Sequence, residues 1–214
     1  MLGAAPRRRG YVAAMPRLDE LLDPPEPART LLVTPDDVGG QAAWHVLVRD
    51  GALVRVRGHL AVLARTDVTP GLRARSLVDV VPRTAVAAGR TAAWVHTGAP
   101  RSETLDLAYG AGRHRPEVWA AARVWQAPLM RGDWQSLGGV RVTTPLRTVV
   151  DVALRDDPEL ALPVVLALVM TCGVALDDAA RRLESRARAV GRPRARLLLG
   201  DARAALAAQA APVP

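Results

Sequence analysis

Several residue types are missing from this sequence of 214 residues, and each absence excludes a kind of chemistry. The chain contains no lysine, phenylalanine, isoleucine or asparagine, so all 29 basic residues are arginines. Without lysine it cannot form a P-loop, a Schiff-base site or a serine–lysine catalytic pair, because each of these requires the amine. A single cysteine, Cys172, excludes a disulfide framework and a CxxC metal site. Its apolar surroundings predict a small buried side chain in a reducing compartment.

Long apolar segments are also scarce. The longest uncharged run, Leu160–Leu176, has about the minimum length of a membrane span, but Pro163 and Gly173 interrupt it. A buried helix ending at Gly173 is therefore preferred, and no membrane partner is expected. Near the N-terminus, Arg7–Arg9 are not followed by the apolar core of a signal peptide. We interpret residues 1–14 either as a flexible basic arm or as residues upstream of a true start at Met15, and we expect a cytoplasmic protein.

Half of the sequence is hydrophobic, which predicts a globular chain with a core of leucine, valine and alanine. The formal net charge of +8 favours an anionic partner such as nucleic acid. The missing residue types, however, are typical of GC-rich coding DNA, and such a bias raises arginine content everywhere. A solvated basic surface is therefore the alternative interpretation of the charge.

The order of the hydrophobic patterns predicts an α+β fold. We expect an N-terminal winged helix-turn-helix followed by a mixed α/β domain that ends in a helical bundle. The expected divisions are a partly flexible tail with a short helix (residues 1–30), a winged helix-turn-helix (31–70), a C-terminal α/β domain (71–208) and a frayed tail (209–214).

The winged helix-turn-helix is predicted from glycine-broken helices and a hairpin. A helix capped by Thr34 stops at Gly39-Gly40, and a second helix follows in the segment QAAWHVLVRDG. The segment ALVRVRGHLAVL then alternates apolar and basic residues and turns at Gly58-His59. Two short helices followed by a basic hairpin are typical of a winged helix.

The second helix and the hairpin supply the predicted DNA-binding residues. One helical face is expected to present Gln41, Trp44, His45, Val48 and Arg49, opposite Ala43, Val46 and Leu47. Glutamine and arginine reach base edges in a major groove, and guanidinium groups suit phosphate. The candidate contact residues are Gln41, His45, Arg49, Arg55, Arg57 and His59. The alternative is an ordinary amphipathic helix with Trp44 in the core and a hairpin kept soluble by its charge.

The remaining two thirds of the chain are predicted to mix helices and strands before becoming helical. Helices are expected at 72–81 and 84–96, strands at 103–109, 118–126 and 140–143, and helices at 145–154, 159–172, 176–189 and 192–208. In the segment GGVRVTTPLRTVVDVA, Thr144 is a good N-cap and Pro145 a good first helical residue. Arg147 precedes Asp151 by four residues, which is the weaker orientation for helix support, so the pair requires another explanation.

No catalytic site emerges from the rest of the sequence, and neither a metal nor another cofactor is expected. Gly110 and Gly112 follow a strand, but the third glycine of a dinucleotide fingerprint is replaced by Arg115. The four histidines are widely spaced and the acids are scattered. A basic segment, Arg181–Arg203, suggests the outside of a terminal helix, a nucleic-acid backbone contact or a partner contact.

The segments LLVTPDDV, VRDGALVRVRGHLAV, RTAAWVHTG and GGVRVTTPLRTVVDVA, in this order, resemble actinobacterial AbiEi-type antitoxins. The resemblance covers roughly residues 31–205. It implies autoregulation, in which a winged helix binds double-stranded DNA at the operon's own promoter. It also implies that the protein neutralises a nucleotidyltransferase-like toxin without forming a stable complex with it.

The resemblance also suggests a role for the Thr144, Arg147 and Asp151 motif. The pattern recurs in the family whatever the neighbouring toxin, so we interpret Arg147 and Asp151 as a structural joint whose members pair mainly with adjoining elements. A functional surface of the antitoxin domain is the alternative. Two other classes of function remain: a protein-interaction module that binds a toxin or another partner through its helical half, and a degenerate nuclease.

Overall fold

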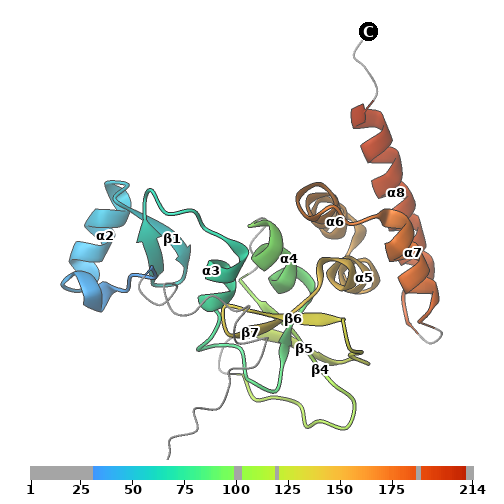
Figure 1. The fold of residues 1–214 in the computed structure, drawn as a ribbon, viewed down its shortest axis with the longest axis horizontal. Coiled ribbons are helices and arrows are strands. Elements are labelled where there is room, and N and C mark those ends of the chain that lie inside the picture. Colours follow the sequence, from blue (N-terminus) through green and yellow to red (C-terminus); the bar gives the residue numbers. More distant parts are fainter. Residues whose placement is uncertain (1–30, 99–102, 119–120, 187–188, 211–214) are drawn as a thin grey trace, which may run out of the picture.

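The computed structural model describes residues 31–98, 103–118, 121–186 and 189–210, which adopt an α+β fold with seven α-helices and two sheets (Figure 1). The predicted fold class is confirmed at this level. The helices are η2 (Pro35–Val38, a 3-10 turn), α2 (Gln41–Arg49), α3 (Pro70–Arg75), α4 (Gly89–Thr97), α5 (Pro145–Arg155), α6 (Pro158–Cys172), α7 (Leu176–Glu184) and α8 (Arg192–Ala210). The strands are β1 (Leu53–Arg57), β2 (Leu60–Leu63), β3 (Val86–Ala87), β4 (Leu105–Tyr109), β5 (Ala122–Gln126), β6 (Trp134–Leu137) and β7 (Val140–Thr143).

The N-terminal unit, residues 31–64, consists of η2, α2 and the β1–β2 hairpin. The carboxylate of Asp37 accepts hydrogen bonds of 2.7 Å from both the backbone N–H and the hydroxyl of Thr34, which fixes the start of η2. Gly39 and Gly40 then adopt positive φ angles and separate η2 from α2. The first predicted helix is therefore a single 3-10 turn, whereas the second helix lies where the sequence predicts it.

The hairpin has apolar side chains on both faces because it lies between two other elements (Figure 1). Leu53 and Ala61 pack against Trp44 of α2. Val56 and Val62 point to the opposite face and belong to the large cluster that contains α3 and the second sheet. The hairpin therefore joins the N-terminal unit to the rest of the core.

The second sheet is mixed, with strand order β5-β4-β3-β7-β6. Strand β3 is antiparallel to β4 and parallel to β7, while β4 and β5 are parallel and β6 and β7 antiparallel. Alternate residues of β4 point to opposite faces. Leu105 and Leu107 join the cluster that includes α3, whereas Asp106 contacts Arg123 of β5 and the start of α4. Asp106 thereby links β4 to the edge strand β5 and to the start of α4.

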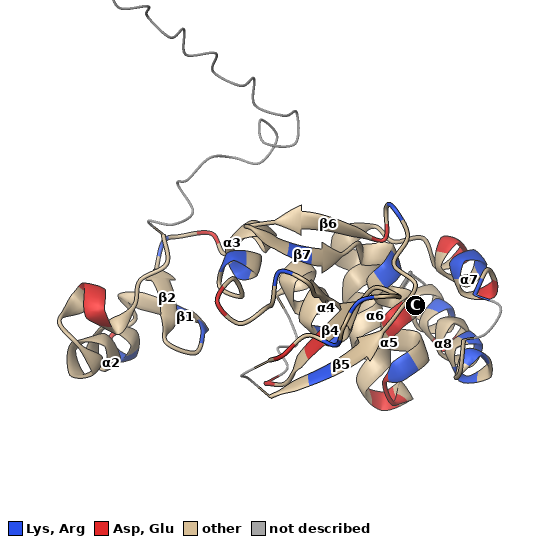
Figure 2. Cartoon of the chain, turned by 90° about the horizontal axis from the view of Figure 1, so that it is seen from below, with Lys and Arg blue, Asp and Glu red and all other residues tan. Residues whose placement is uncertain are grey.

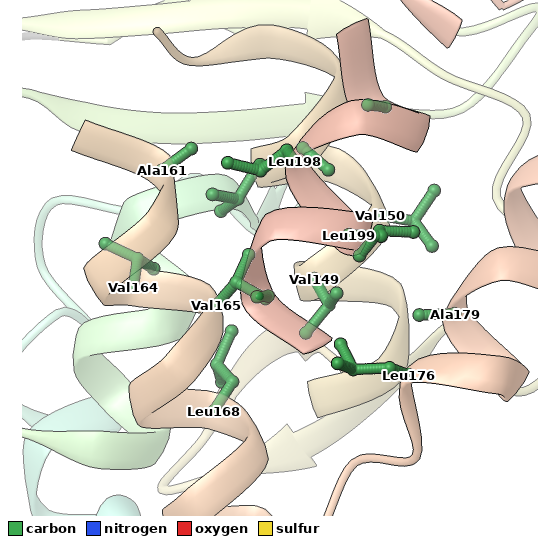
Figure 3. Packing of buried hydrophobic residues seen from close by; sticks show 14 of the residues in the cluster. Val149, Val150, Ala161, Val164, Val165, Leu168, Leu176, Ala179, Leu198 and Leu199 are labelled. Carbon is green, nitrogen blue, oxygen red and sulfur yellow. The ribbon is translucent and has the colours of Figure 1, made fainter. Parts of the chain in front are cut away.

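The helical half packs around α5. Val149 and Val150 of α5, Val165 and Leu168 of α6, and Leu198 of α8 meet in one buried cluster (Figure 3). Burying a leucine or valine side chain contributes about 1.5–3 kcal/mol. This cluster therefore fixes α5, and with it the polar residues at both ends of the helix.

Several predicted elements are wrong in their bounds. The helix expected at 72–81 begins at Pro70, because Thr69 accepts a hydrogen bond from the backbone N–H of Leu72, and ends at Arg75. The valine-rich stretch after it has low helix propensity and forms turns. The segment 84–96 contains β3 before α4; extended Ala88 lies between them, and Gly89, with a positive φ, is the first residue of α4.

Other differences lie toward the C-terminus. Strand β6 was not predicted, and α7 ends at Glu184 rather than at 189. Residues 209–210 belong to α8, whereas the rest of the expected frayed tail and the N-terminal tail lie outside the described residues. Cys172, expected to be buried, is only partly buried at the end of α6. None of the helices in the described part of the chain has the length and apolarity to cross a membrane.

Candidate functional site

The exposed face of α2 differs in part from the predicted one. Gln41, His45 and Arg49 are exposed as expected. Trp44, which was expected to share their face, is completely buried, and Val46 is exposed instead of packing inward. The tryptophan lies inward because the hairpin covers it, as the amphipathic-helix alternative requires. The three candidate contact residues of α2 thus all lie on its outside.

Trp44 is the point at which α2 and the hairpin meet. The guanidinium carbon of Arg55 lies 4.7 Å from the centroid of the Trp44 ring. The rings of His45 and His59 approach the same tryptophan, with centroid distances of 5.4 and 5.9 Å. Arg55, His45 and His59 are all exposed. One helix residue, one strand residue and one residue of the hairpin tip are thus brought together, while Arg57 is half-buried next to the tip.

The positive charge of residues 31–70 is confined to one part of the segment. Between residues 49 and 65 the arginines exceed the single acid, Asp50, by three charges. Asp36, Asp37 and Asp67 balance this surplus, so residues 31–70 are neutral in sum. Arg49 also forms an exposed ion pair of 3.0 Å with Asp50. Any attraction of this unit for an anion therefore acts at short range, through Arg55 and its neighbours.

Arg147 is almost completely buried, with 1% of its side chain exposed. Its Nε donates to Asp151 Oδ2 at 2.9 Å, within α5. Its Nη1 donates to Asp133 Oδ2 at 2.6 Å and to the backbone carbonyl of Pro128 at 3.2 Å, both in the segment before β6. Arg147 therefore pairs with Asp151 and also with an adjoining element. Thr144 caps α5 by accepting a hydrogen bond of 3.4 Å from the backbone N–H of Arg147.

Asp133 connects this buried pair to α7. It accepts hydrogen bonds from the backbone N–H of Met130 at 3.0 Å and from the guanidinium of Arg182, and Arg186 lies 4.0 Å away. Burial by itself would raise the pKa of Asp133, but the Met130 N–H and the charges of Arg182 and Arg147 hold that pKa below its ordinary value. Asp133 is therefore an ionised group that joins three elements.

A second ion network lies at the other end of α5. Arg123 donates from Nε and Nη2 to the two carboxylate oxygens of Asp106, at 2.9 and 2.8 Å, and from Nη2 to Asp156 at 2.6 Å. Burial raises the pKa of Asp156, against the opposing effect of Arg123. Asp106 also accepts the backbone N–H of Arg90 at the start of α4. Figure 2 shows that acidic and basic positions occur together on the ribbon around α5 and on α7.

Sequence reasoning missed Asp133, Asp106 and Asp156. Each carboxylate pairs with an arginine from another element, at 14 to 33 residues of separation for the pairs with Arg147 and Arg123. No local pattern marks such partners, although the turn around Gly132-Asp133 could have suggested an aspartate that binds its own backbone.

The histidines divide between surface and core. His96 is buried, and its Nε2 donates to the backbone carbonyl of Thr143 at 2.7 Å, whereas His45, His59 and His114 are exposed. Burial lowers the pKa of His96. Within the described ranges, no group of three or more His, Cys, Asp or Glu side chains is arranged to hold a metal ion.

Comparisons with known proteins identify no family and no activity for this chain. No protein-family model matches the chain, and no curated protein matches it. Among solved structures, the chain is similar to the crystal structure of RV2827C protein from Mycobacterium tuberculosis, with 19% sequence identity and a TM-score of 0.42. The match covers 87% of this chain and 80% of that chain. A likeness of this extent assigns no activity to this protein.

Proposed function

We propose that the protein is a cytoplasmic DNA-binding transcriptional regulator in which residues 31–70 act as a winged helix-turn-helix. The observation that carries the proposal is the meeting of α2 and the hairpin at Trp44, which groups His45, Arg55 and His59 on one exposed surface. In this arrangement α2 enters a major groove and the hairpin tip contacts the neighbouring backbone.

The side chains on this surface suit the two kinds of contact that DNA offers. Gln41 and Arg49 of α2 are exposed and can donate to base edges. Arg55 and Arg57 of β1 can neutralise phosphates, which supplies most of the affinity and makes it depend on salt. Trp44 holds Arg55 in place through the contact of 4.7 Å, so the guanidinium is ordered before DNA arrives.

The antitoxin role belongs to the same proposal and rests on the sequence resemblance to AbiEi-type proteins. In that role the mixed α/β domain and its helical bundle counter a nucleotidyltransferase-like toxin, and the winged helix autoregulates the promoter of its own operon. The chain acts in this proposal as a non-enzymatic regulator without a cofactor.

The test is fluorescence anisotropy with the DNA upstream of the gene and with a scrambled duplex, each at two salt concentrations. Arg55→Ala/Arg57→Ala is expected to weaken binding and to lower the slope of log affinity against log salt by about 2, one for each lost phosphate contact. Arg131→Ala/Arg141→Ala is the matched control, because it removes two exposed arginines from another part of the surface.

Each result has a definite meaning for the proposal. Tighter binding of the native duplex, lost in the Arg55/Arg57 variant and kept in the control, supports a DNA-reading winged helix. Equal affinity for both duplexes, or an equal loss in the two variants, contradicts it and leaves only general arginine electrostatics. Co-purification of a stable toxin complex with weak, salt-insensitive DNA binding would favour the protein-interaction alternative.

A further inference from the structure

A pocket of about 950 Å³ opens between β5, the segment after it, the end of α5 and α7. Every charged residue of its lining is an arginine. Its lining includes Arg123, Trp125, Met130, Arg155, Arg182 and Arg186. The volume lies within the range of small-molecule sites, and the lining combines apolar surface with a few convergent polar groups, as such sites do.

The acids that balance these arginines lie behind the pocket wall and not in it. The side chains of Asp106, Asp133, Asp151 and Asp156 are at most 3% exposed. Their neighbours are the four arginines of the lining together with Arg90 and Arg147. Six guanidinium groups and four carboxylates leave two positive charges in excess. The pocket therefore presents positive charge to its interior.

Arg155 supplies part of this excess. Its guanidinium carbon lies 4.5 Å from the centroid of the Trp125 ring, and it has no ion-pair partner among the residues that the structure describes. Burial lowers the pKa of Arg155; the charge of Asp151 opposes this effect, and Arg123 and Arg147 add to it. A partly desolvated cation with cationic neighbours is stabilised by an incoming anion.

Two further arginines are held in position by the buried acids. Arg182 donates to Asp133, and Arg186 lies 3.5 Å from Asp151. Fixed guanidinium groups lose little entropy on binding and match the geometry of phosphate oxygens. Met130 and Val190, which are 61% and 93% exposed, provide apolar surface against which a flat ring can lie, whereas the Trp125 ring is buried beneath Arg155.

We propose that this pocket binds a free nucleotide, with its phosphate against Arg155, Arg182 and Arg186 and its base against Met130 and Val190. A small anion without a ring would leave the apolar wall unused, and an uncharged ring would leave the surplus positive charge uncompensated. A nucleotide satisfies both features at once. The site is separate from the N-terminal unit, so the inference does not depend on DNA binding.

Isothermal titration calorimetry of the full chain tests the proposal with 5′-AMP, 5′-GMP, adenosine, inorganic phosphate and a short single-stranded oligonucleotide. Saturable binding of at least one monophosphate is expected, at least tenfold tighter than that of adenosine or phosphate. These measurements on the unaltered protein decide the question even if a variant does not fold.

Substitutions then locate the site. Arg155→Ala is expected to weaken nucleotide binding about tenfold or more, because a charged hydrogen bond is lost. Arg155→Lys should restore part of the affinity. Arg141→Ala is the matched control, since Arg141 lies 4.9 Å over Trp134, an arginine–tryptophan contact outside the pocket, and its removal should change nothing.

Four outcomes would overturn the proposal. They are the absence of saturable binding, binding of phosphate as tight as that of any nucleotide, binding of the oligonucleotide alone, and an equal loss of affinity in the Arg155→Ala and Arg141→Ala proteins. The second outcome would reduce the pocket to a general anion site, and the third would assign it to a nucleic-acid strand.

Discussion

Replacing Arg147 by methionine is expected to destabilise the fold strongly. Methionine keeps much of the apolar stem but removes the charge between Asp133 and Asp151, whose side chains are 3% and 0% exposed. Breaking a buried ion pair by removing one partner costs about 3–5 kcal/mol, since the remaining charge is left in a medium that solvates it poorly. Arg182 and Arg186 still reach the two carboxylates, so we expect the lower part of that range, about 3 kcal/mol.

Urea unfolding followed by far-UV circular dichroism measures the effect. For a chain of this size the loss corresponds to a fall in melting temperature of roughly 6–12 °C. Arg141→Met, on the exposed side of β7, is the control and should stay within about 0.5 kcal/mol of the unaltered protein. A loss below about 1 kcal/mol in Arg147→Met would refute the assignment of Arg147 as a joint. A stable Arg147→Ala protein that had lost only toxin neutralisation would make this residue part of a functional surface instead.

Two further predictions concern buried carboxylates. The pKa of Asp133 is lowered on folding, so its ionised carboxylate stabilises the fold above the pKa of the unfolded chain. This stabilisation is lost as pH falls through the lower folded-state pKa. Asp133→Asn should therefore flatten the fall in urea midpoint below about pH 4, and an unchanged dependence of the midpoint on pH in this range would contradict the assignment. Gly89 has a φ of 49°, and a Cβ there would lie 2.5 Å from Asp106 Oδ2, so Gly89→Ala should cost about 2 kcal/mol or more in thermal unfolding. Gly200→Ala, in open space on α8, should be neutral or stabilising, and equal behaviour of the two variants would refute the steric argument.

The sequence predicts elements well where local chemistry decides them. Thr144 and Pro145 mark the start of α5, and alternation marks β1, because capping and side-chain period are properties of neighbouring residues. Strand β6 escapes prediction, since its residues Trp134–Leu137 form an edge strand that is mostly exposed and shows no apolar alternation. Strand β3 is only two residues long and lies in an alanine-containing run that also suits a helix.

In the candidate sites too, the sequence predicts what depends on neighbouring residues and misses what depends on tertiary packing. The exposed positions of Gln41, His45 and Arg49 follow from helical period alone, but the burial of Trp44 depends on the hairpin that covers it. Asp133 cannot be paired with Arg147 from sequence, because a turn and two strands separate them and tertiary packing brings them together. The arginine-lined pocket combines four segments and is for the same reason invisible in the sequence.

The two apolar faces of the β1–β2 hairpin have a mechanical consequence. Val56 and Val62 would be exposed to water if residues 31–70 were separated from the rest of the chain, and α3 would lose the layer that covers it. The helix α2, which presents Gln41 and His45, is therefore not free to rotate independently of the rest of the core. The hairpin lies between α2 and the cluster that contains α3 and the second sheet, so a change in packing beneath α3 would alter the orientation of α2.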